Sequence, residues 1–388
     1  EQEMFSGQSE DDVEVLDSNT KSMLMSLMGE LKIGMDLTKI PIPCDFLEPR
    51  SLLEKLTDFL SHCQILCNAP DLDDPLDRMV EIVRAYLSGW HVKPRGVKKP
   101  YNPILGELFR CNYELPDGSI LTFFTEQVSH HPPISALYGE NVQKGIVIEG
   151  WYYPRSKFLG NSAASMTEGV CKISFKKHNE AYVCSWPNVY ARGVIFGRLL
   201  MEMGGKTSIS CVKTGLSAEI DFKTKPFFGG EYNVVSASIK KKKTTIYQIR
   251  GKWNDKLFIR PKKLVGKKDD KLFFDAKSHL IIPKHCPDYD SLEENESRKL
   301  WINLTHAIMK NDVKGATQEK AKVEDAQREK KKIRDKESST SYEPQFFKKG
   351  PEDFWIFTGK DHKLYTDLLN KQLEKITKKD QQQQPQQQ

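Results

Sequence analysis

The sequence predicts a mainly β fold with flanking α-helices. From about residue 108 to residue 276, apolar residues recur with a period of two, which is typical of β-strands. Turn sequences such as Pro116–Gly118 and Lys213–Gly215 separate many of these segments. Because no helical pattern alternates with the strands, the sheet should be antiparallel rather than built from βαβ units.

The number of strand-like segments restricts the architecture. They are Leu108–Leu115, Ile120–Val128, Gly145–Tyr153, Gly169–Lys176, Tyr182–Trp186, Ser208–Val212, Ala218–Phe222, Tyr232–Ile239, Thr245–Arg250, Leu257–Arg260 and Leu272–Phe274. More than about ten consecutive antiparallel strands must split into two sheets or close on themselves. A barrel of about eight strands fills its interior with side chains, whereas a larger one leaves a lumen. We therefore expect a hollow that can take a sizeable ligand.

Helical patterns flank the β-rich segment. A capping serine predicts a helix over Ser51–Cys67, and an Asp-Pro start predicts another over Asp74–Ser88. Two more are expected after the strands, over Glu293–Lys310 and Val313–Lys336. A short amphipathic helix is predicted over Ser22–Leu31 from apolar residues at helical spacing: Met23, Leu24, Leu27, Met28 and Leu31.

Charge is unevenly distributed along the chain, whose net charge is +6. The first 17 residues carry seven acids and no Lys or Arg, so residues 1–20 should form a disordered acidic tail. Residues 21–375 are expected to form one domain, and 376–388 a Gln-rich disordered tail. Lysines gather at 240–243, 262–263, 267–268 and 330–332. Such runs suit a membrane, a nucleic acid or a phosphorylated ligand, unless they are ordinary solvated faces.

No membrane-spanning segment is predicted, because no run of about 18 apolar residues occurs. No signal peptide is predicted either, because no basic segment followed by an apolar one opens the chain. The eight cysteines are scattered, which indicates free thiols in a reducing cytosol. His62, Cys63 and Cys67 form the one tight Cys/His group, and only His285-Cys286 could supply a second ligand pair for zinc. We expect no metal site.

The most unusual string is EQVSHHPP, Glu126–Pro133. It follows a predicted strand and ends in a double proline, which enforces extended backbone. Two adjacent histidines are thereby held at a fixed place. They are either surface residues at a rim or donors to an anion, since histidine can carry charge near neutral pH.

Several strings resemble enzyme motifs without completing them. Ser129 beside His130 lacks the surrounding Gly-x-Ser-x-Gly elbow. The string Gly204–Thr207 resembles the end of a phosphate loop, but position 200 is Leu where that motif needs Gly. Lys271–Lys277 is interpreted as a late strand rather than a receptor-docking two-phenylalanine motif, because a lysine stands where an acid is wanted. We expect no enzyme activity and no cofactor.

Two further basic groups stand out. Lys98–Pro103 leads into Ile104–Glu107. Lys320, Glu324 and Arg328 follow one another at i, i+4 and i+8, which places them on one helix face. They form either a solvated ion-pair ladder or a phosphate clamp in which Glu324 holds the cations in place.

Together these strings resemble the oxysterol-binding-protein-related family. EQVSHHPP is the family signature, and KPYNPILGE (99–107) and the 320–328 ladder in a KxxxExxQR setting are further hallmarks. The likeness covers about residues 22–350. It implies a large incomplete antiparallel β-barrel that encloses a lipid tunnel. The implied parts are an N-terminal lid (about 22–48), helices (50–90), the barrel (100–276) and C-terminal helices (290–375).

The resemblance also implies ligands and site residues. Phosphatidylinositol 4-phosphate is the shared ligand, and the residues implied at its headgroup are Lys99, Asn102, His130, His131, Lys320 and Arg328, with Glu324 in support. The implied lid residues are Leu24, Leu27, Met28, Leu31, Ile42, Phe46 and Leu47.

Three strings look like the phosphatidylserine-exchanging subgroup: Gly34–Leu37, Tyr86–His91 and Ser156–Ala164. Asn161 and Ser162 would then meet the serine headgroup. One departure leaves the second lipid open between phosphatidylserine and sterol. The subgroup usually reads LPTFIL before Glu-Pro, whereas this chain reads IPCDFL over 42–47, with Asp45 in place of an apolar lid residue.

The resemblance predicts a cytosolic lipid transfer protein, a short form without a pleckstrin-homology domain. It should exchange phosphatidylserine against phosphatidylinositol 4-phosphate as a monomer, in transient contact with anionic membranes. The expected location is peripheral, at membranes such as endoplasmic reticulum–plasma membrane contact sites. The alternatives are a sterol/phosphatidylinositol 4-phosphate exchanger and a lipid sensor with little bulk transfer. A nucleic-acid partner is not expected, since no recognition module accompanies the lysines.

Overall fold

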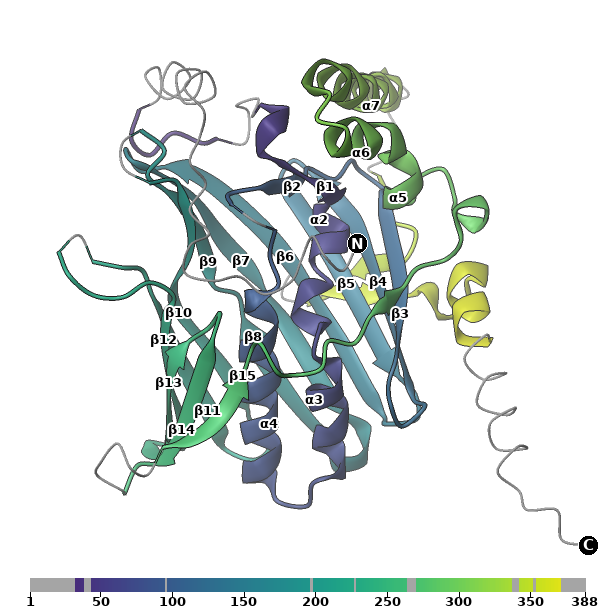
Figure 1. The fold of residues 1–388 in the computed structure, drawn as a ribbon. Helices are drawn as coiled ribbons and strands as arrows, with labels where there is room; N and C mark the ends of the chain where they lie inside the picture. Colours follow the sequence, from purple (N-terminus) through teal and green to yellow (C-terminus); the bar gives the residue numbers. More distant parts are fainter. Residues whose placement is uncertain are drawn as a thin grey trace, which may run out of the picture.

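The computed structural model describes residues 32–37, 43–94, 96–195, 198–226, 228–263, 270–336, 342–351 and 354–370 (Figure 1). The two predicted tails and the helix over Ser22–Leu31 fall outside these residues. So do the lid residues Leu24, Leu27, Met28, Leu31 and Ile42. No helix in the described part of the chain is long and apolar enough to cross a bilayer.

A single antiparallel sheet dominates the molecule. Its fourteen strands in the described residues are β3 (Leu108–Glu114), β4 (Ile120–His130), β5 (Pro133–Asn141), β6 (Ile146–Phe158), β7 (Ser162–Phe175), β8 (Glu180–Ser185), β9 (Asn188–Arg192), β10 (Leu200–Cys211), β11 (Leu216–Lys223), β12 (Val234–Lys241), β13 (Thr244–Lys252), β14 (Lys256–Pro261), β15 (Lys271–Asp275) and β16 (Lys284–His285). Each strand segment predicted from the sequence overlaps one of them. The mainly β antiparallel fold is therefore confirmed.

The sheet is open. Its order runs from β15 through β14, β13, β12, β11, β10, β8, β7, β6, β5, β4 and β3 to β16, and β9 pairs with β10 and β7. In the described residues β15 and β16 are the two ends and do not pair with each other. The sheet curls around the N-terminal helices (Figure 1), so the barrel is incomplete.

The N-terminal helices fill part of this curve. They are α2 (Leu52–Lys55), α3 (Cys63–Asn68) and α4 (Pro75–Ser88), and their apolar side chains share one buried core with residues of β3 through β15. The Asp74 carboxylate accepts the Leu76 N–H at 2.8 Å, which confirms the predicted start of α4.

The single helix predicted over Ser51–Cys67 is wrong. The segment breaks into α2, a short 3-10 turn and α3. The hydroxyls of Thr57 and Ser61 donate to the carbonyls of Glu54 and Asp58 at 2.6 and 2.7 Å. Such local side-chain bonds offer the backbone an alternative to a continuous helix.

Three strands of the main sheet were not predicted: β5, β9 and the two-residue β16. β5 begins at a proline and contains Gly139, where a Cβ would lie 3.2 Å from the Phe123 ring, so close packing explains a glycine in this strand. β9 is short, and its five residues are all half-buried, so no alternation marks it. The string Gly204–Thr207 lies inside β10 and forms no phosphate loop. Lys271–Asp275 forms β15, with Phe273 and Phe274 buried, as predicted.

The C-terminal region adds helices and an aromatic cluster. α5 (Ser297–Leu300), α6 (Ile302–Met309) and α7 (Val313–Lys336) follow the sheet, and α7 matches its predicted bounds. The small sheet of β17 (Phe347–Lys349) and β18 (Trp355–Phe357) belongs to a cluster that also packs Phe346 and Tyr365 against Phe124 of β4. This cluster fixes the chain end against the main sheet.

All eight cysteines are free thiols, and the group at His62 has other partners than a metal. His62 Nδ1 lies 2.8 Å from the Leu280 carbonyl and its Nε2 lies 2.7 Å from Nε2 of His91. A carbonyl only accepts, so His62 Nδ1 carries a proton. When both rings are neutral, His91 Nε2 donates to His62 Nε2, and two charged rings would leave this contact without an acceptor. Burial lowers the pKa of each to about 4.

We predict that this pair makes the fold acid-sensitive. Between pH 6.5 and about 4 the unfolded chain binds protons that the folded pair does not, so stability falls as pH falls. Each histidine contributes a slope of about 1.4 kcal/mol per pH unit. The variant His91→Gln keeps a donor toward His62. In urea denaturation at several pH values, its free energy of unfolding should fall less steeply with decreasing pH, by about that slope. An unchanged slope would contradict the assignment.

Candidate functional site

Lys99 is placed by a small parallel sheet. It begins β2 (Lys99–Tyr101), which pairs with β1 (Leu47–Ser51), so that Leu47 lies opposite Lys99. Leu47 and Phe46, both expected in the lid, are buried. Phe46 packs against Phe158 of β6 and residues around it. Phe46 and Leu47, the described residues of the expected lid, are thus buried next to β2 and hold the strand that carries Lys99 in position.

His130 ends β4, and its ring faces α7. The two imidazole rings of His130 and His131 lie 4.6 Å apart, and His131 is exposed. Gln327 Nε2 lies 2.7 Å from His130 Nε2. Burial, and then the charge of His131, lowers the pKa of His130 to about 4, while the Pro103 carbonyl and Glu324 act in the opposite direction. At neutral pH His130 is therefore uncharged.

Glu324 lies among the cations of this cluster. Its carboxylate pairs with Lys320 Nζ at 2.5 Å, and both side chains are half-buried on α7. Burial lowers the pKa of Lys99, the charge of Lys320 lowers it further, and Glu324 partly offsets both. The structure therefore brings Lys99, Lys320, Glu324 and His130 together at one end of the sheet. We call these four residues and His131 the rim cluster.

Two of the expected headgroup residues, Arg328 and Asn102, are exposed. The Arg328 guanidinium pairs with Asp325 rather than Glu324, and 61% of its side chain is exposed. Asn102 is exposed in the segment after β2. Their role at a headgroup stays a prediction, as it does for the rim cluster.

Gln327 lies at this site, although no role was predicted for it from the sequence. Its Oε1 accepts the Leu105 N–H at 3.1 Å while its Nε2 meets His130. It thus ties α7 to both signature strings, KPYNPILGE and EQVSHHPP. The sequence feature that could have predicted its role is its position seven residues after Lys320, which puts Gln327 on the same helix face.

Two buried carboxylates hold the rim in place. Glu107, fully buried, accepts from the Ser51 hydroxyl, the Ser297 hydroxyl (2.7 Å), the Trp301 Nε1–H (2.9 Å) and the Ile104 N–H (3.0 Å). These donors come from β1, α5, the residue after α5 and the segment after β2. A buried acceptor must be satisfied, so Glu107 joins these elements.

Glu126 has the corresponding role for the C-terminal segment. It is fully buried and accepts from the Tyr342 hydroxyl at 3.0 Å and from the backbone N–H groups of Gln345 and Phe346, both at 2.8 Å. The acid of EQVSHHPP is therefore bound by the protein itself, and only the histidines of that string remain near the rim.

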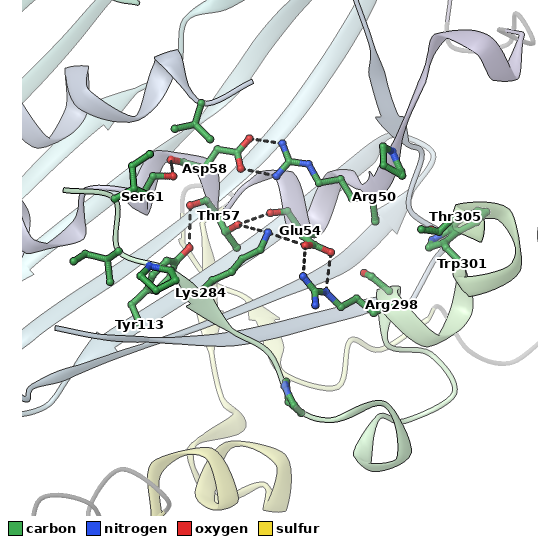
Figure 2. A pocket seen from close by; sticks show the side chains of 18 of the residues that line it. Arg50, Glu54, Thr57, Asp58, Ser61, Tyr113, Lys284, Arg298, Trp301 and Thr305 are labelled. Carbon is green, nitrogen blue, oxygen red and sulfur yellow. Dashed lines mark hydrogen bonds and ion pairs between the residues drawn. The ribbon is translucent and has the colours of Figure 1, made fainter. Parts of the chain in front are cut away.

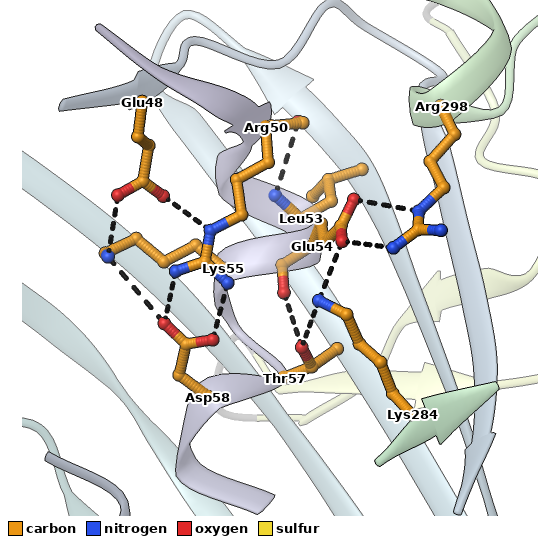
Figure 3. Close-up of polar contacts among 10 residues, drawn as sticks. Glu48, Arg50, Leu53, Glu54, Lys55, Thr57, Asp58, Lys284 and Arg298 are labelled. Atoms are coloured by element: carbon orange, nitrogen blue, oxygen red, sulfur yellow. Dashed lines mark hydrogen bonds and ion pairs between the residues drawn. The ribbon is translucent and has the colours of Figure 1, made fainter. Parts of the chain in front are cut away.

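A cavity of about 860 Å³ lies beside β1 and α2 (Figure 2). Its charged walls pair with one another (Figure 3). Arg50 bonds Glu48 at 2.8 Å and Asp58 at 2.6 Å. Glu54 meets Lys284 and Arg298 at 2.7 and 2.8 Å. Burial raises the pKa of Glu54, but these two cations outweigh it and bring the pKa down to about 2. The network connects β1 to β16 and α5, and each of its four cations, Lys55 included, forms an ion pair with an acid of the network.

A smaller cavity of about 470 Å³ adjoins His131. Asp36, Arg155 and Lys157 lie on its walls, together with Tyr153. Lys157 is exposed, and Arg155 pairs with Glu168 at 2.6 Å. This cavity, unlike the larger one, lies at the rim.

Two of the three strings assigned to a second lipid, Gly34–Leu37 and Ser156–Ala164, lie beside one another. The Gly34 N–H donates to the Phe158 carbonyl at 2.7 Å, which places the segment 32–37 along the end of β6. The Asn161 side chain accepts the Ile195 N–H at 2.9 Å, and the Ser162 carbonyl accepts the Leu159 N–H at 2.8 Å. Asn161 thus orders a neighbouring turn, and contact of either residue with a lipid stays a prediction.

A model of the oxysterol-binding protein family matches residues 26–366. The chain belongs to the oxysterol-binding protein family. It is 44% identical over 369 residues to Oxysterol-binding protein 4 of Dictyostelium discoideum, a match that covers 93% of this chain and 78% of that protein. It is 37% identical over 363 residues to human Oxysterol-binding protein-related protein 5, covering 92% of this chain but 41% of the human protein. The resemblance drawn from the motifs is confirmed.

Solved structures of the family share the fold. The Osh1 ORD domain in complex with ergosterol superposes with a TM-score of 0.75 and 26% identity, over 94% of this chain and 92% of that one. The Osh3 ORD from Saccharomyces cerevisiae, in complex with PI(4)P, gives a TM-score of 0.68 over 94% of this chain and 97% of that one. Because the identity to the Osh3 domain is 20%, this second match shows only that the two chains share a fold.

We predict that Glu107 is the main stabilising acid of this family member. Glu107→Ala leaves four donors without their acceptor and should lower the free energy of unfolding by about 3 kcal/mol. The matched control is Glu294→Ala, where an acid that is 89% exposed pairs only with Lys299, and it should cost less than about 0.5 kcal/mol. Equal losses in urea denaturation would refute this role.

Proposed function

We propose that this chain is a lipid carrier that extracts phosphatidylinositol 4-phosphate and exchanges it for phosphatidylserine between membranes. The observation that carries the proposal is the rim cluster, in which Lys99 and Lys320 share one acid, Glu324, at the edge of an open antiparallel sheet. The family motifs on which the chain resembles lipid exchangers contribute these same residues.

Electrostatics supports an anionic ligand at the rim. Lys99 is half-buried, and burial and Lys320 both lower its pKa, so its charged form lacks a full complement of negative charge. A phosphate beside Lys99 and Lys320 would supply that charge, and buried phosphate in turn requires cations. The same phosphate would raise the pKa of His130 and favour its charged, donating form.

The acyl chains require shelter from water. A two-chain lipid has on the order of 30 methylenes, each worth about 0.8 kcal/mol when buried, so exposure would cost roughly 25 kcal/mol. We place the chains on the concave side of the main sheet under the N-terminal lid. The carrier would work in the cytosol as a monomer, at membranes such as endoplasmic reticulum–plasma membrane contact sites.

Sterol is the second candidate for the exchanged lipid. Two observations favour it: the Osh1 domain, 26% identical to this chain, was solved with ergosterol, and Asp45 stands where the phosphatidylserine subgroup has an apolar residue. Loading the protein with each lipid from vesicles separates the candidates. If the protein takes up sterol but not phosphatidylserine, sterol is the exchanged lipid. If Ser162→Ala loses uptake of phosphatidylserine alone, the proposed exchange of phosphatidylserine is supported.

We predict that His130→Ala combined with His131→Ala lowers the rate of phosphatidylinositol 4-phosphate extraction from liposomes about ten-fold or more, because donors at the rim are removed. The control replaces two exposed histidines that do not belong to the rim cluster, His285 and His306, by alanine. Intact extraction in the rim variant would refute the proposal. Tight binding with negligible transfer by the unmodified protein would indicate a sensor instead.

We further predict that Lys320→Ala weakens transfer of phosphatidylinositol 4-phosphate more than transfer of the second lipid, since only the former brings an extra phosphate to the rim. Lys322→Ala is the control: this side chain is 69% exposed on the same helix and pairs with Glu319. Transfer of both lipids is measured between two liposome populations. An equal loss of both would point to a shared site or a folding defect rather than a phosphate clamp.

A further inference from the structure

One segment of the chain connects the two end strands of the main sheet. β15 ends at Asp275 and β16 begins at Lys284, and these strands lie at opposite ends of the sheet order. The residues between them, 276–283, cross in front of the N-terminal helices (Figure 1). We call residues 276–283 the strap. The strap therefore joins the ends of the curled sheet through the chain itself.

Few contacts fasten the far end of the strap. The Ile282 N–H donates to the Ser61 carbonyl at 2.8 Å, and Lys284, just beyond the strap, pairs with Glu54 at 2.7 Å (Figure 3). β16 itself adds only two residues to the sheet, beside β3. A strand this short at the edge of a sheet has few hydrogen bonds, so it should open more readily than the central strands.

Two thiols face each other where β16 meets β3. The register of these strands ends with His285 opposite Asn112. Because the strands are antiparallel, the next residues, Cys286 and Cys111, are opposite each other. Cys286 packs against the apolar core to which Cys111 belongs, and both cysteines are free thiols. Burial raises the pKa of Cys111, and the nearby Cys286 thiolate raises it further, which agrees with their proximity.

Opposed residues of an antiparallel pair have the separation that a disulfide needs. Their Cα atoms lie about 4.5 or 5.5 Å apart, and their side chains point to the same face of the sheet. A disulfide accepts Cα separations of about 4.4–6.8 Å. A bond between Cys111 and Cys286 therefore requires no rearrangement of either strand.

Exposure distinguishes this pair from a second pair of opposed cysteines. Cys171 of β7 lies opposite Cys184 of β8, but both are buried, and burial raises the pKa of both thiols. Cys111 is buried as well, whereas its neighbour Cys286 is only half-buried. Oxidants react with accessible thiolates, so Cys286 should react first.

We propose that Cys286 is a site of oxidation by peroxide, and that the product is a disulfide with Cys111 that clasps the end of the strap to β3. Such bonds are uncommon in a reducing cytosol, where those that form are usually transient and sense the redox state. The clasp is thus open under reducing conditions and closes when peroxide is present.

The reaction takes two steps. The Cys286 thiolate attacks one oxygen of hydrogen peroxide, so that an S–O bond forms and the O–O bond breaks. The leaving hydroxide takes up the proton lost by Cys286 and becomes water. The Cys111 sulfur then attacks the sulfur of the sulfenic acid, an S–S bond forms, the S–O bond breaks, and a second water leaves with the Cys111 proton. The two thiols are oxidised by two electrons, and the peroxide is reduced by the same two.

The disulfide closes a loop around most of the sheet. Strands β4 to β15 lie between Cys111 and Cys286 in the sequence, so one covalent loop encloses all of them together with the strap. Such a loop reduces the freedom of the unfolded chain. It also holds β16 at the sheet edge, where hydrogen bonds are few. Oxidation should therefore stabilise the fold and suppress local opening of β16.

The test uses the whole chain, which is reduced, freed of reductant, and then kept with or without hydrogen peroxide. Remaining thiols are blocked with N-ethylmaleimide, and disulfides are mapped by mass spectrometry of unreduced peptides. We expect peroxide to produce a link between Cys111 and Cys286 that dithiothreitol removes, and no link between Cys171 and Cys184. The variant Cys286→Ala removes the accessible thiol, and Cys184→Ala is the matched control in the second pair. Circular dichroism verifies that both variants fold.

Two physical measurements follow the clasp. Peroxide should move the urea denaturation midpoint of the unmodified protein and of Cys184→Ala to a higher concentration, and dithiothreitol should reverse the shift. Cys286→Ala should show no shift. Exchange of the backbone amide hydrogens of β16 should be about ten-fold or more slower in the oxidised protein than in the reduced one.

Several results would overturn the proposal. One is two free thiols at Cys111 and Cys286 after peroxide treatment, and another is Cys286 oxidised to sulfinic acid with Cys111 unlinked. A link from Cys111 to the buried Cys63 would assign the oxidation to the core instead. A midpoint that stays unchanged although the link is mapped, or one that also shifts in Cys286→Ala, would show that the bond does not clasp the sheet.

Discussion

The arrangement of this molecule depends on hydrogen bonds to two buried carboxylates. Glu107 and Glu126 sit in regions with no access to water, where an unpaired acceptor would cost several kcal/mol. Each therefore gathers donors from segments far apart in sequence: Glu107 from β1 and the α5 region, Glu126 from the C-terminal segment. The rim cluster lies where these segments meet, so its geometry depends on the two acids although neither is needed to touch a ligand.

The balance of charge distinguishes a supporting network from a candidate binding site. Beside β1 and α2, Glu54 has two cations, and Arg50 is held between two acids, so every charge has a partner inside the protein. At the rim, Lys320 pairs with Glu324, whereas Lys99 forms no ion pair within the described residues, and burial and the charge of Lys320 lower its pKa. The cations beside the larger cavity are thus directly paired, and the cation without an ion pair lies at the rim.

The elements predicted correctly from the sequence are those that local residue patterns determine. Period-two segments gave the strands from β3 to β15 apart from β5 and β9, and the Asp-Pro start gave α4, because these signals lie within a few residues. The break of 51–67 depended on hydroxyl groups that bond nearby carbonyls, which the apolar spacing does not record. β5 begins with Pro133, the last residue of the signature string, and its glycine is explained by close packing against β4.

The sequence predicted which residues belong to the site, but it did not predict which side chains contact one another there. Three motifs converge on one end of the sheet, as expected, yet the partner of each side chain is decided by tertiary contacts. Gln327 meets His130 because α7 crosses the end of β4, and Arg328, one residue later, turns to Asp325. Nothing in the spacing of Lys320, Glu324 and Arg328 separates the ion pair that forms from the one that does not.

An irregularity in β4 explains how one signature string serves two purposes. Gln127 lies opposite Ser135, but Ser129 lies opposite Ile134, so Val128 is an extra residue that bulges out of the ladder. A bulge breaks the alternation of faces and redirects the side chains that follow it. Before the bulge, Glu126 is committed to the C-terminal segment; after it, His130 faces α7. In a regular strand with no bulge, Glu126 and His130 are four positions apart and would share a face. The bulge therefore lets the string anchor the chain end with its acid and still present its histidines at the rim.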